Sequence, residues 1–177
     1  IATSPDDVMM VCTGGTTGRP KGVMWRQSDT YVVSMHGADH ASVDEIHAKL
    51  GFEGQPWFAV SPLMHAAGMW TAFVGLLNGL PIVLYDKTRF DPCAVLETAE
   101  REKVGMMTMV GDAYAGPLVE ELRSGSYDLS SMYAIGTGGA ATNPKHQQAL
   151  LELLPQITLI NGYGSSETGN VGFGRSE

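Results

Sequence analysis

Short apolar runs alternate with longer segments that carry helix signals along most of this chain. Residues 8–12, 57–60 and 106–110 have the length and apolar content of buried strands. Asp91-Pro92 opens one of the longer segments and combines an N-cap residue with a proline at the first helical position. This alternation predicts an α/β fold in which a mostly parallel sheet is covered by helices on both faces.

The elements expected from these patterns cover most of the chain. The expected strands are residues 8–12, 22–26, 57–60, 81–85, 106–110, 133–135 and 158–163, the last of these being the final strand. The expected helices are residues 29–37, 66–77, 91–103, 112–122 and 143–154, with Gly105 as the cap that ends the third. Residues 41–56 are poorly patterned and expected to be irregular, whereas residues 66–77 are apolar on most faces and expected to form a buried helix.

Size and charge narrow the function classes. The chain has 177 residues, enough for one domain with a core, and its net charge of −8 argues against nucleic acid as a partner. The most apolar stretch, residues 70–85, is interrupted at Asn78, Gly79 and Pro81, so no segment is expected to span a membrane, and no signal peptide is visible. Cys12 and Cys93 lie in apolar contexts and are expected to be buried free thiols, which suits a cytoplasmic protein.

The densest chemistry lies in residues 13–23, which read Thr-Gly-Gly-Thr-Thr-Gly-Arg-Pro-Lys-Gly-Val and follow an expected strand. Glycines allow backbone N–H groups to turn toward an anion, hydroxyls add hydrogen bonds, and the lysine adds a positive charge. Pro20 and Gly22 flank that lysine, whereas the usual nucleotide P-loop ends in Gly-Lys-Ser/Thr. We therefore predict a phosphate-binding loop of another type, formed by Thr13, Gly14, Gly15, Thr16, Thr17, Gly18 and Lys21.

This loop resembles the signature loop of the AMP-forming acyl-CoA synthetases, a superfamily that includes luciferases and the adenylation domains of peptide synthetases. Cys12 and Gly14 stand where Tyr and Ser are frequent, and the continuation 24–27 looks most like bacterial fatty-acyl-CoA synthetases. The resemblance implies that the loop embraces the β- and γ-phosphates of ATP. It also implies that this chain, which begins at Ile1, is one α/β subdomain (residues 1–177) of a longer enzyme's N-terminal domain.

A second motif, Asn161-Gly-Tyr-Gly-Ser-Ser-Glu167, closes the last expected strand, where sites in parallel sheets gather. The family pattern is Tyr-Gly-x-Thr-Glu, and Ser166 keeps the hydroxyl of its Thr. The resemblance implies that Tyr163 flanks adenine, that Ser166 touches the α-phosphate and that Glu167 binds Mg²⁺, with Thr16 as a second magnesium residue. Asn161, Gly162 and Gly164 belong to the same nucleotide site by resemblance. Without the resemblance, the motif reads as a polar turn after a strand.

Three further patterns carry weaker signals. Residues 136–141 fit the dinucleotide motif G-x-G-x-x-[GA], but the acid expected about 20 residues later is missing; the resemblance instead places Gly138, Gly139 and Ala140 beside the adenine and acyl pockets. It places His65 near the carboxylate and Trp70 along the carbon chain, although a structural histidine near a helix start fits His65 equally well. His36 and His40 are spaced i, i+4 but lack the further ligands of a zinc site.

The resemblance implies a two-step reaction: a carboxylic acid, expected to be a fatty acid, attacks ATP to give acyl-AMP, and coenzyme A (CoA) then displaces AMP. ATP, Mg²⁺ and CoA are the implied cofactors, and Lys21 and Glu167 the implied catalytic residues. This piece alone is expected to be inactive and to self-associate through an exposed apolar face. The alternatives are a non-catalytic nucleotide-binding module and a P-loop-like phosphohydrolase.

Overall fold

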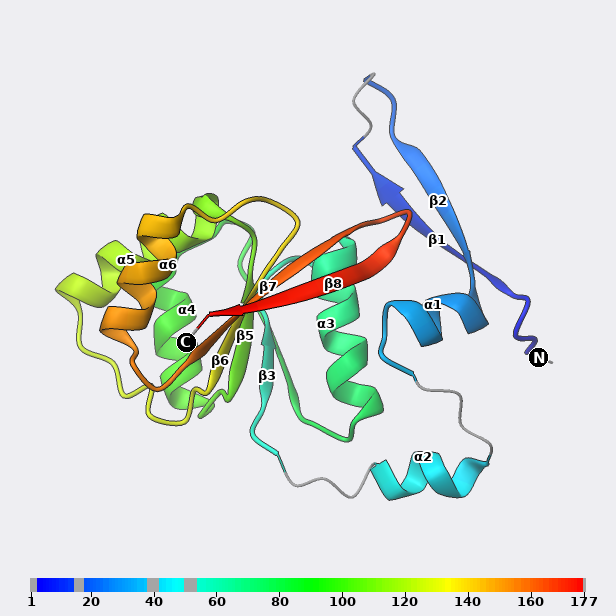
Figure 1. Cartoon of the computed structure of the whole chain (residues 1–177), viewed down its shortest axis with the longest axis horizontal. Helices are drawn as coiled ribbons and strands as arrows, with labels where there is room; N and C mark the ends of the chain where they lie inside the picture. Colours follow the sequence, from blue (N-terminus) through cyan, green and yellow to red (C-terminus); the bar gives the residue numbers. More distant parts are fainter. Residues whose placement is uncertain (1–2, 15–17, 38–41, 50–53, 177) are drawn as a thin grey trace.

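A computed structural model describes residues 3–14, 18–37, 42–49 and 54–176, and its largest unit is a six-stranded sheet (Figure 1). The strand order is β4-β3-β5-β6-β7-β8, and every neighbouring pair is parallel except β7 and β8. The strands are β3 (Trp57–Ala59), β4 (Ile82–Leu84), β5 (Met106–Met109), β6 (Ala134–Thr137), β7 (Thr158–Ser165) and β8 (Gly169–Ser176). The predicted α/β class with a mostly parallel sheet is confirmed.

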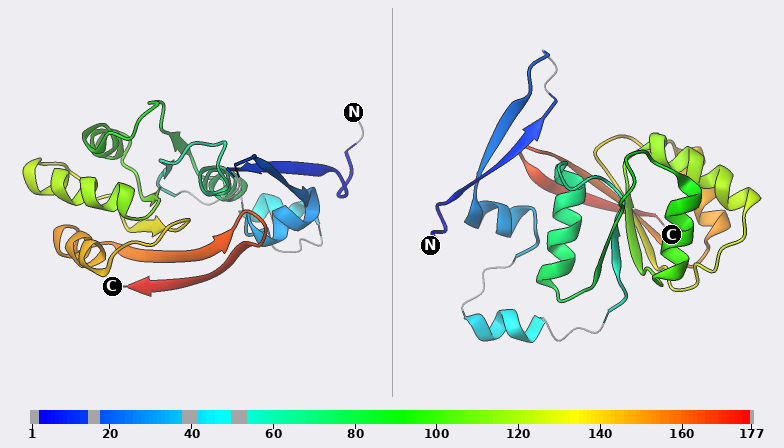
Figure 2. Two further views of the ribbon diagram at one scale, coloured as in Figure 1. Left: turned by 90° about the horizontal axis from the view of Figure 1, so that it is seen from above. Right: turned by 180° about the vertical axis from the view of Figure 1, so that it is seen from behind.

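Helices lie on both faces of this sheet, as predicted. Figures 1 and 2 show α4 (Pro92–Arg101), α5 (Asp112–Ser124) and α6 (Pro144–Leu153) on one face and α3 (Ala66–Leu77) on the other. Two short helices, α1 (Gln27–Val33) and α2 (Val43–Lys49), lie beyond α3. None of the helices in the described ranges is long and apolar enough to cross a membrane.

A separate antiparallel hairpin precedes the sheet. It consists of β1 (Val8–Thr13) and β2 (Lys21–Arg26), and its register pairs Thr13 with Lys21. Side chains alternate between the two faces of a strand, so Lys21, Val23 and Trp25 share one face. Val23 and Trp25 on that face are half-buried, whereas Met24 on the other face is exposed. The hairpin therefore rests on the rest of the molecule by its Val23–Trp25 face.

The core of the sheet is a row of side chains on the face that packs against α4, α5 and α6. Phe58, Met107, Ile135 and Leu159 are fully buried, and each is the cross-strand partner of the next. The strand residues next to this row point to the opposite face, because side chains alternate along a strand. Thr108 is an example: its hydroxyl lies 3.4 Å from the hydroxyl of Thr71 in α3. This row fixes the register of four strands, so that their carboxyl ends finish together.

Helix α4 begins as predicted but ends differently. The Asp91 carboxylate accepts a hydrogen bond from the Ala94 N–H at 3.3 Å, with Pro92 in the first turn. At the other end Lys103 takes a left-handed conformation (φ 51°), and the Val104 N–H donates to the Ala99 carbonyl at 3.0 Å. The prediction that Gly105 caps this helix is therefore wrong; its N–H donates to the Pro56 carbonyl and joins the helix end to the start of β3.

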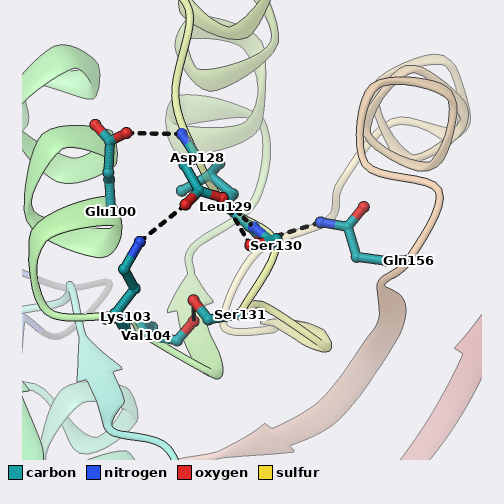
Figure 3. Close-up of polar contacts among 8 residues, drawn as sticks. All are labelled: Glu100, Lys103, Val104, Asp128, Leu129, Ser130, Ser131 and Gln156. Atoms are coloured by element: carbon teal, nitrogen blue, oxygen red, sulfur yellow. Dashed lines mark hydrogen bonds and ion pairs between the residues drawn. The ribbon is translucent and has the colours of Figure 1, made fainter.

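Lys103 and the loop before β6 form a polar network at the amino ends of the strands (Figure 3). Asp128 accepts from Lys103 Nζ at 2.9 Å and from the Ser130 hydroxyl, while its own N–H donates to Glu100. The Ser130 hydroxyl, followed by the Lys103 ammonium, holds the pKa of Asp128 below its usual range. Gln156 completes the network by donating to the Leu129 carbonyl. These bonds are satisfied within the protein, which marks this end of the sheet as structural.

Three other expectations need correction. Helix α2 lies within residues 41–56, which had been expected to be irregular, and residues 161–167 do not close the last strand because β8 follows them. Helix α3 matches its predicted limits but is only partly buried, with Phe73 and Leu76 exposed. Strand β8 is rich in glycine and lacks an apolar run, so its pairing with β7 is a tertiary effect that local patterns do not report.

Met107→Ala tests the buried row. The substitution removes a fully buried side chain from the middle of the sheet, so we expect the free energy of unfolding to fall by about 2–5 kcal/mol in urea unfolding experiments. Met24→Ala is the matched control, because Met24 is 71% exposed and its loss should change stability by less than about 0.5 kcal/mol. Equal losses in the two variants would contradict the assigned core.

Candidate nucleotide site at the carboxyl edge of the sheet

The loops after β5 and β6 meet β7 at the carboxyl edge of the sheet. A Cβ placed on Gly138 would lie 3.1 Å from the Gly162 carbonyl oxygen, and one placed on Gly111 would lie 2.7 Å from the Cβ of Ala140. Gly111 (φ 56°) and Gly139 (φ 74°) also adopt left-handed conformations that favour glycine. The structure thus brings together the predicted residues Gly138, Gly139 and Ala140 with Asn161 and Gly162. Glycines leave the backbone at this edge uncovered by side chains.

Polar contacts fix these loops from the side of α5 and α6. The Asp112 carboxylate accepts from the Asn143 N–H at 2.8 Å and lies 2.8 Å from Nδ1 of His146. These two contacts, the Asn143 N–H first, hold the pKa of Asp112 below its ordinary value of 3.8. The Asn161 amide donates to Gln147, so it is already engaged with α6. These contacts tie the residues that flank the Gly138–Ala140 loop to the starts of α5 and α6.

Residues 163–167 lie on a hairpin that extends from this edge. Tyr163 and Gly164 belong to β7, while Ser166, Glu167 and Thr168 form the turn to β8. The Ser165 hydroxyl accepts from the N–H groups of Glu167 and Thr168, both at 3.2 Å. The Tyr163 ring is 76% exposed, and Glu167 is exposed with no ion pair among the described residues. An aromatic face and a carboxylate are thus presented to solvent from a turn of fixed shape.

The predicted phosphate loop joins the two strands of the β1–β2 hairpin. Thr13 ends β1, Lys21 begins β2, and Gly14 and Gly18 lie between them; Gly15, Thr16 and Thr17 lie outside the described residues. No described atom lies within 4 Å of a Cβ placed on Gly14 or Gly18, and the side chain of Lys21 is exposed. The described part of the loop is therefore open to an incoming anion.

One hydrogen bond joins the two motif-bearing hairpins. Nε1 of Trp25, in β2, donates to the Ser166 carbonyl oxygen at 2.7 Å across 141 residues of sequence. The same ring lies against the turn, because a Cβ on Gly169 (φ 67°) would be 3.4 Å from the Trp25 ring. Sequence reasoning missed Trp25 as a functional residue; its only local signal is that it shares a strand face with Lys21.

His65 and Trp70 lie in the first part of α3. His65 occupies the N-cap position and is exposed, and its side chain makes no capping bond. Trp70 is half-buried, and its buried Nε1 has no hydrogen-bond partner in the described part of the protein. Within the described ranges, no hydrogen bond or ring contact links either side chain to Gly138. The role of His65, Trp70 and Gly138 in binding the acid stays a prediction.

Cys12 and Cys93 are free, as expected, but the expectation that both are buried is wrong, because Cys12 is exposed and Cys93 is half-buried. His40 lies outside the described residues, and the His36 ring packs edge-on against Phe173 at 5.5 Å. Within the described ranges, no three His, Cys, Asp or Glu side chains gather into a metal-binding group. Glu167 is thus a single carboxylate, which suits a Mg²⁺ ion held mainly by substrate phosphates and water.

Residues 1–176 match the profile of the family described as AMP-binding enzyme. The chain belongs to this family. This confirms the resemblance drawn from the phosphate loop and from the Tyr163–Glu167 motif.

Among curated relatives, "Medium-chain acyl-CoA ligase Mig" of Mycobacterium avium is 40% identical over 173 residues, covering 93% of this chain and 32% of the relative. A "Medium/long-chain-fatty-acid--CoA/3-oxocholest-4-en-26-oate--CoA ligase" of Mycobacterium tuberculosis is 37% identical and covers 94% of this chain and 31% of the relative. The chain therefore spans about a third of the length of these relatives.

Solved structures agree on the fold. PA1221, described as an NRPS protein containing adenylation and PCP domains, superposes with a TM-score of 0.76 at 22% identity, covering all of this chain and 34% of that one. The o-succinylbenzoate CoA synthetase of Bacillus subtilis, solved with ATP and magnesium, gives a TM-score of 0.69 at 24% identity. The match covers 93% of this chain and 31% of that one. This AMP-binding family chain thus has the fold of adenylating enzymes.

The Asp112 contacts predict a pH effect on stability. Because the folded-state pKa of Asp112 lies below 3.8, its carboxylate contributes stability that is complete above the unfolded pKa, near 3.8, and is lost as pH falls through the folded pKa. We expect Asp112→Asn to lower the melting temperature at pH 7, with a difference from wild type that shrinks as pH drops below about 4.

Glu97→Gln serves as the control, since Glu97 is an exposed carboxylate of α4 without a hydrogen bond or ion pair among the described residues. Its melting temperature should follow that of wild type at every pH. A constant offset between Asp112→Asn and wild type down to pH 2 would refute the role given to the Asp112 charge.

Proposed function

We propose that the full-length protein containing this chain is an AMP-forming acid–thiol ligase that activates a carboxylic acid, namely a fatty acid, as its CoA thioester. The observation that supports this most strongly is the meeting of the two motif-bearing hairpins through Trp25 and Ser166 in a chain of the AMP-binding family. The names of the Mycobacterium relatives, which refer to medium- and long-chain acyl substrates, support the choice of acid.

The phosphate loop would hold the pyrophosphate part of ATP. In the first step a carboxylate oxygen forms a bond to the α-phosphorus, and the bond from that phosphorus to pyrophosphate breaks. Both reactants are anions, so the reaction depends on positioning and charge neutralisation. We assign these tasks to Lys21 and to the amides and hydroxyls of Thr13, Gly14, Gly15, Thr16, Thr17 and Gly18. In the second step the CoA thiolate attacks the acyl carbon and AMP leaves.

The β7–β8 hairpin would bind the other parts of the nucleotide. In this proposal Tyr163 flanks the adenine, and Gly138, Gly139 and Ala140 line its pocket together with Asn161, Gly162 and Gly164. The Ser166 hydroxyl approaches the α-phosphate, and Glu167, with Thr16, holds Mg²⁺. When bound, the metal ion supplies positive charge to the phosphates. The exposed Glu167 carboxylate on its fixed turn supports this assignment.

The acid would lie near α3. His65, exposed at the start of that helix, is placed near the carboxylate, and Trp70, whose buried Nε1 lacks a described partner, beside the carbon chain together with Gly138. These three assignments come from the family resemblance. Gly68 closely approaches the Ser61 carbonyl, so the start of α3 packs against the chain just after β3. This packing positions the part of the helix that carries His65 and Trp70.

Two alternatives are less well supported. A P-loop phosphohydrolase would carry its phosphate loop between a strand and a helix, whereas this loop joins two antiparallel strands. A non-catalytic nucleotide-binding module would have no need to keep both Lys21 and Glu167, and both are present and exposed.

We also propose that residues 1–177 form a single subdomain that is inactive alone and self-associates. Exposed apolar side chains support this: Val8, Met10 and Met24 form a stripe on the outer face of the β1–β2 hairpin. Such surfaces promote association when nothing covers them.

The products of the first step test the proposed reaction. Incubated with ATP, Mg²⁺ and a panel of carboxylic acids, the full-length protein should form AMP and pyrophosphate and catalyse ATP–pyrophosphate exchange with at least one acid. Medium- and long-chain fatty acids are expected to give the highest rates. Formation of ADP and phosphate would contradict an adenylation mechanism.

Lys21→Ala tests the role of the loop. Removing a charge that acts on the leaving pyrophosphate should slow adenylation by about 10²-fold or more, the scale of losing one electrostatic stabiliser. Thioester formation from supplied acyl-AMP should be nearly unchanged, because pyrophosphate takes no part in that step. Equal losses in both half-reactions would instead assign Lys21 a structural role.

A further inference from the structure

Trp25 is the described residue that joins the phosphate-loop hairpin to the turn that carries Glu167. Its indole N–H donates to the Ser166 carbonyl at 2.7 Å in a partly buried position. That carbonyl belongs to the peptide between Ser166 and Glu167. A hydrogen bond to this oxygen therefore fixes the plane of the peptide from which both side chains depart.

Besides this bond, the hydrogen bonds of the described turn residues 165–168 are short and local. The Ser165 hydroxyl accepts from the N–H groups of Glu167 and Thr168, and the Thr168 hydroxyl accepts from the Ser165 N–H at 3.1 Å. These bonds fix the shape of the turn but not its place relative to the phosphate loop. Gly169 lets the turn approach α1 and the Trp25 ring, since a Cβ there would lie 2.5 Å from the Ser34 hydroxyl. Packing against α1 thus brings the turn to this side of the molecule, and the Trp25 hydrogen bond ties its Ser166–Glu167 peptide to the strand that carries Lys21.

Trp25 and Lys21 belong to the same strand and to the same strand face. Trp25 follows Lys21 by four positions, so their Cα atoms lie roughly 13 Å apart along the strand. A strand paired along its whole length to β1 is a stiff element, so the indole that fixes the turn also fixes its distance from Lys21. The distance between Lys21 and Glu167 is then already set before a ligand that contacts both of them binds.

We propose that Trp25 is a positioning residue for the magnesium carboxylate, acting through the Ser166 carbonyl to hold Glu167 at the distance from Lys21 that Mg²⁺-ATP requires. This inference rests on the proposed function, because it takes Glu167 as the metal residue and Lys21 as a phosphate residue. Trp25 itself touches neither metal nor phosphate. Its effect is to remove the cost of ordering the turn when the ion binds.

Trp25→Phe in the full-length protein tests this inference. The substitution removes the N–H donor and keeps an aromatic ring against the turn. ATP affinity is measured by calorimetry with and without Mg²⁺, so that no turnover is needed. The readout is the factor by which Mg²⁺ increases ATP affinity. We expect this factor to be about three- to tenfold smaller in the variant, which is the scale of one hydrogen bond. ATP affinity without Mg²⁺ should be unchanged.

Trp57→Phe is the matched control. The Trp57 indole also donates one hydrogen bond, to the Tyr133 hydroxyl at 2.9 Å, but it lies at the start of β3, at the end of the sheet away from the turn. Its Mg²⁺ effect on ATP binding should equal that of wild type. Equal Mg²⁺ effects in Trp25→Phe and wild type, or equal losses in Trp25→Phe and Trp57→Phe, would overturn the proposed role.

A second replacement guards against loss of fold. Benzothienylalanine at position 25 keeps the shape of tryptophan and replaces the N–H by sulfur, so it should reproduce the loss of the Mg²⁺ effect in a protein that melts like wild type. A wild-type Mg²⁺ effect in this protein would overturn the inference. A full-length wild type that forms no AMP with any acid would overturn the proposed function instead, and the binding data would still decide the role of Trp25.

Discussion

The buried row Phe58–Met107–Ile135–Leu159 is the constraint on which the rest of the structure depends. It sets the register of four parallel strands, and that register brings the loops after β5 and β6 to one edge, beside Gly162 of β7. There Gly138 closely approaches Gly162, and Gly111 closely approaches Ala140. The fixed register keeps these glycine-rich segments side by side.

The site adds two hairpins to this edge, and the hairpins carry the charged chemistry. Lys21 comes from the β1–β2 hairpin and Glu167 from the β7–β8 turn. In the proposed function, this division lets a chain of net charge −8 hold a triphosphate, with the loop supplying positive charge and the turn recruiting a metal ion. The hydrogen bond between Trp25 and Ser166 sets the relation of the two.

Local signals in the sequence were sufficient for most of the fold. The limits 66–77 for α3 and the caps at Asp91 and Asn143 were found because each depends on residues close together in the chain. Strand β8 was missed because it is rich in glycine and its place depends on pairing with β7, and Lys103 was missed as a helix end because nothing in its type requires a left-handed conformation. The two motifs were recognised from their composition, whereas the bond between Trp25 and Ser166 spans 141 residues and has no local signal.

A crystal structure of the full-length protein with ATP and Mg²⁺ would test the central claim most directly. The account predicts that the triphosphate lies between the Lys21 loop and the Glu167 turn, that the metal ion contacts Glu167, and that the Trp25 indole still donates to the Ser166 carbonyl. Phosphates bound away from both hairpins, or a magnesium ion that Glu167 does not contact, would contradict it.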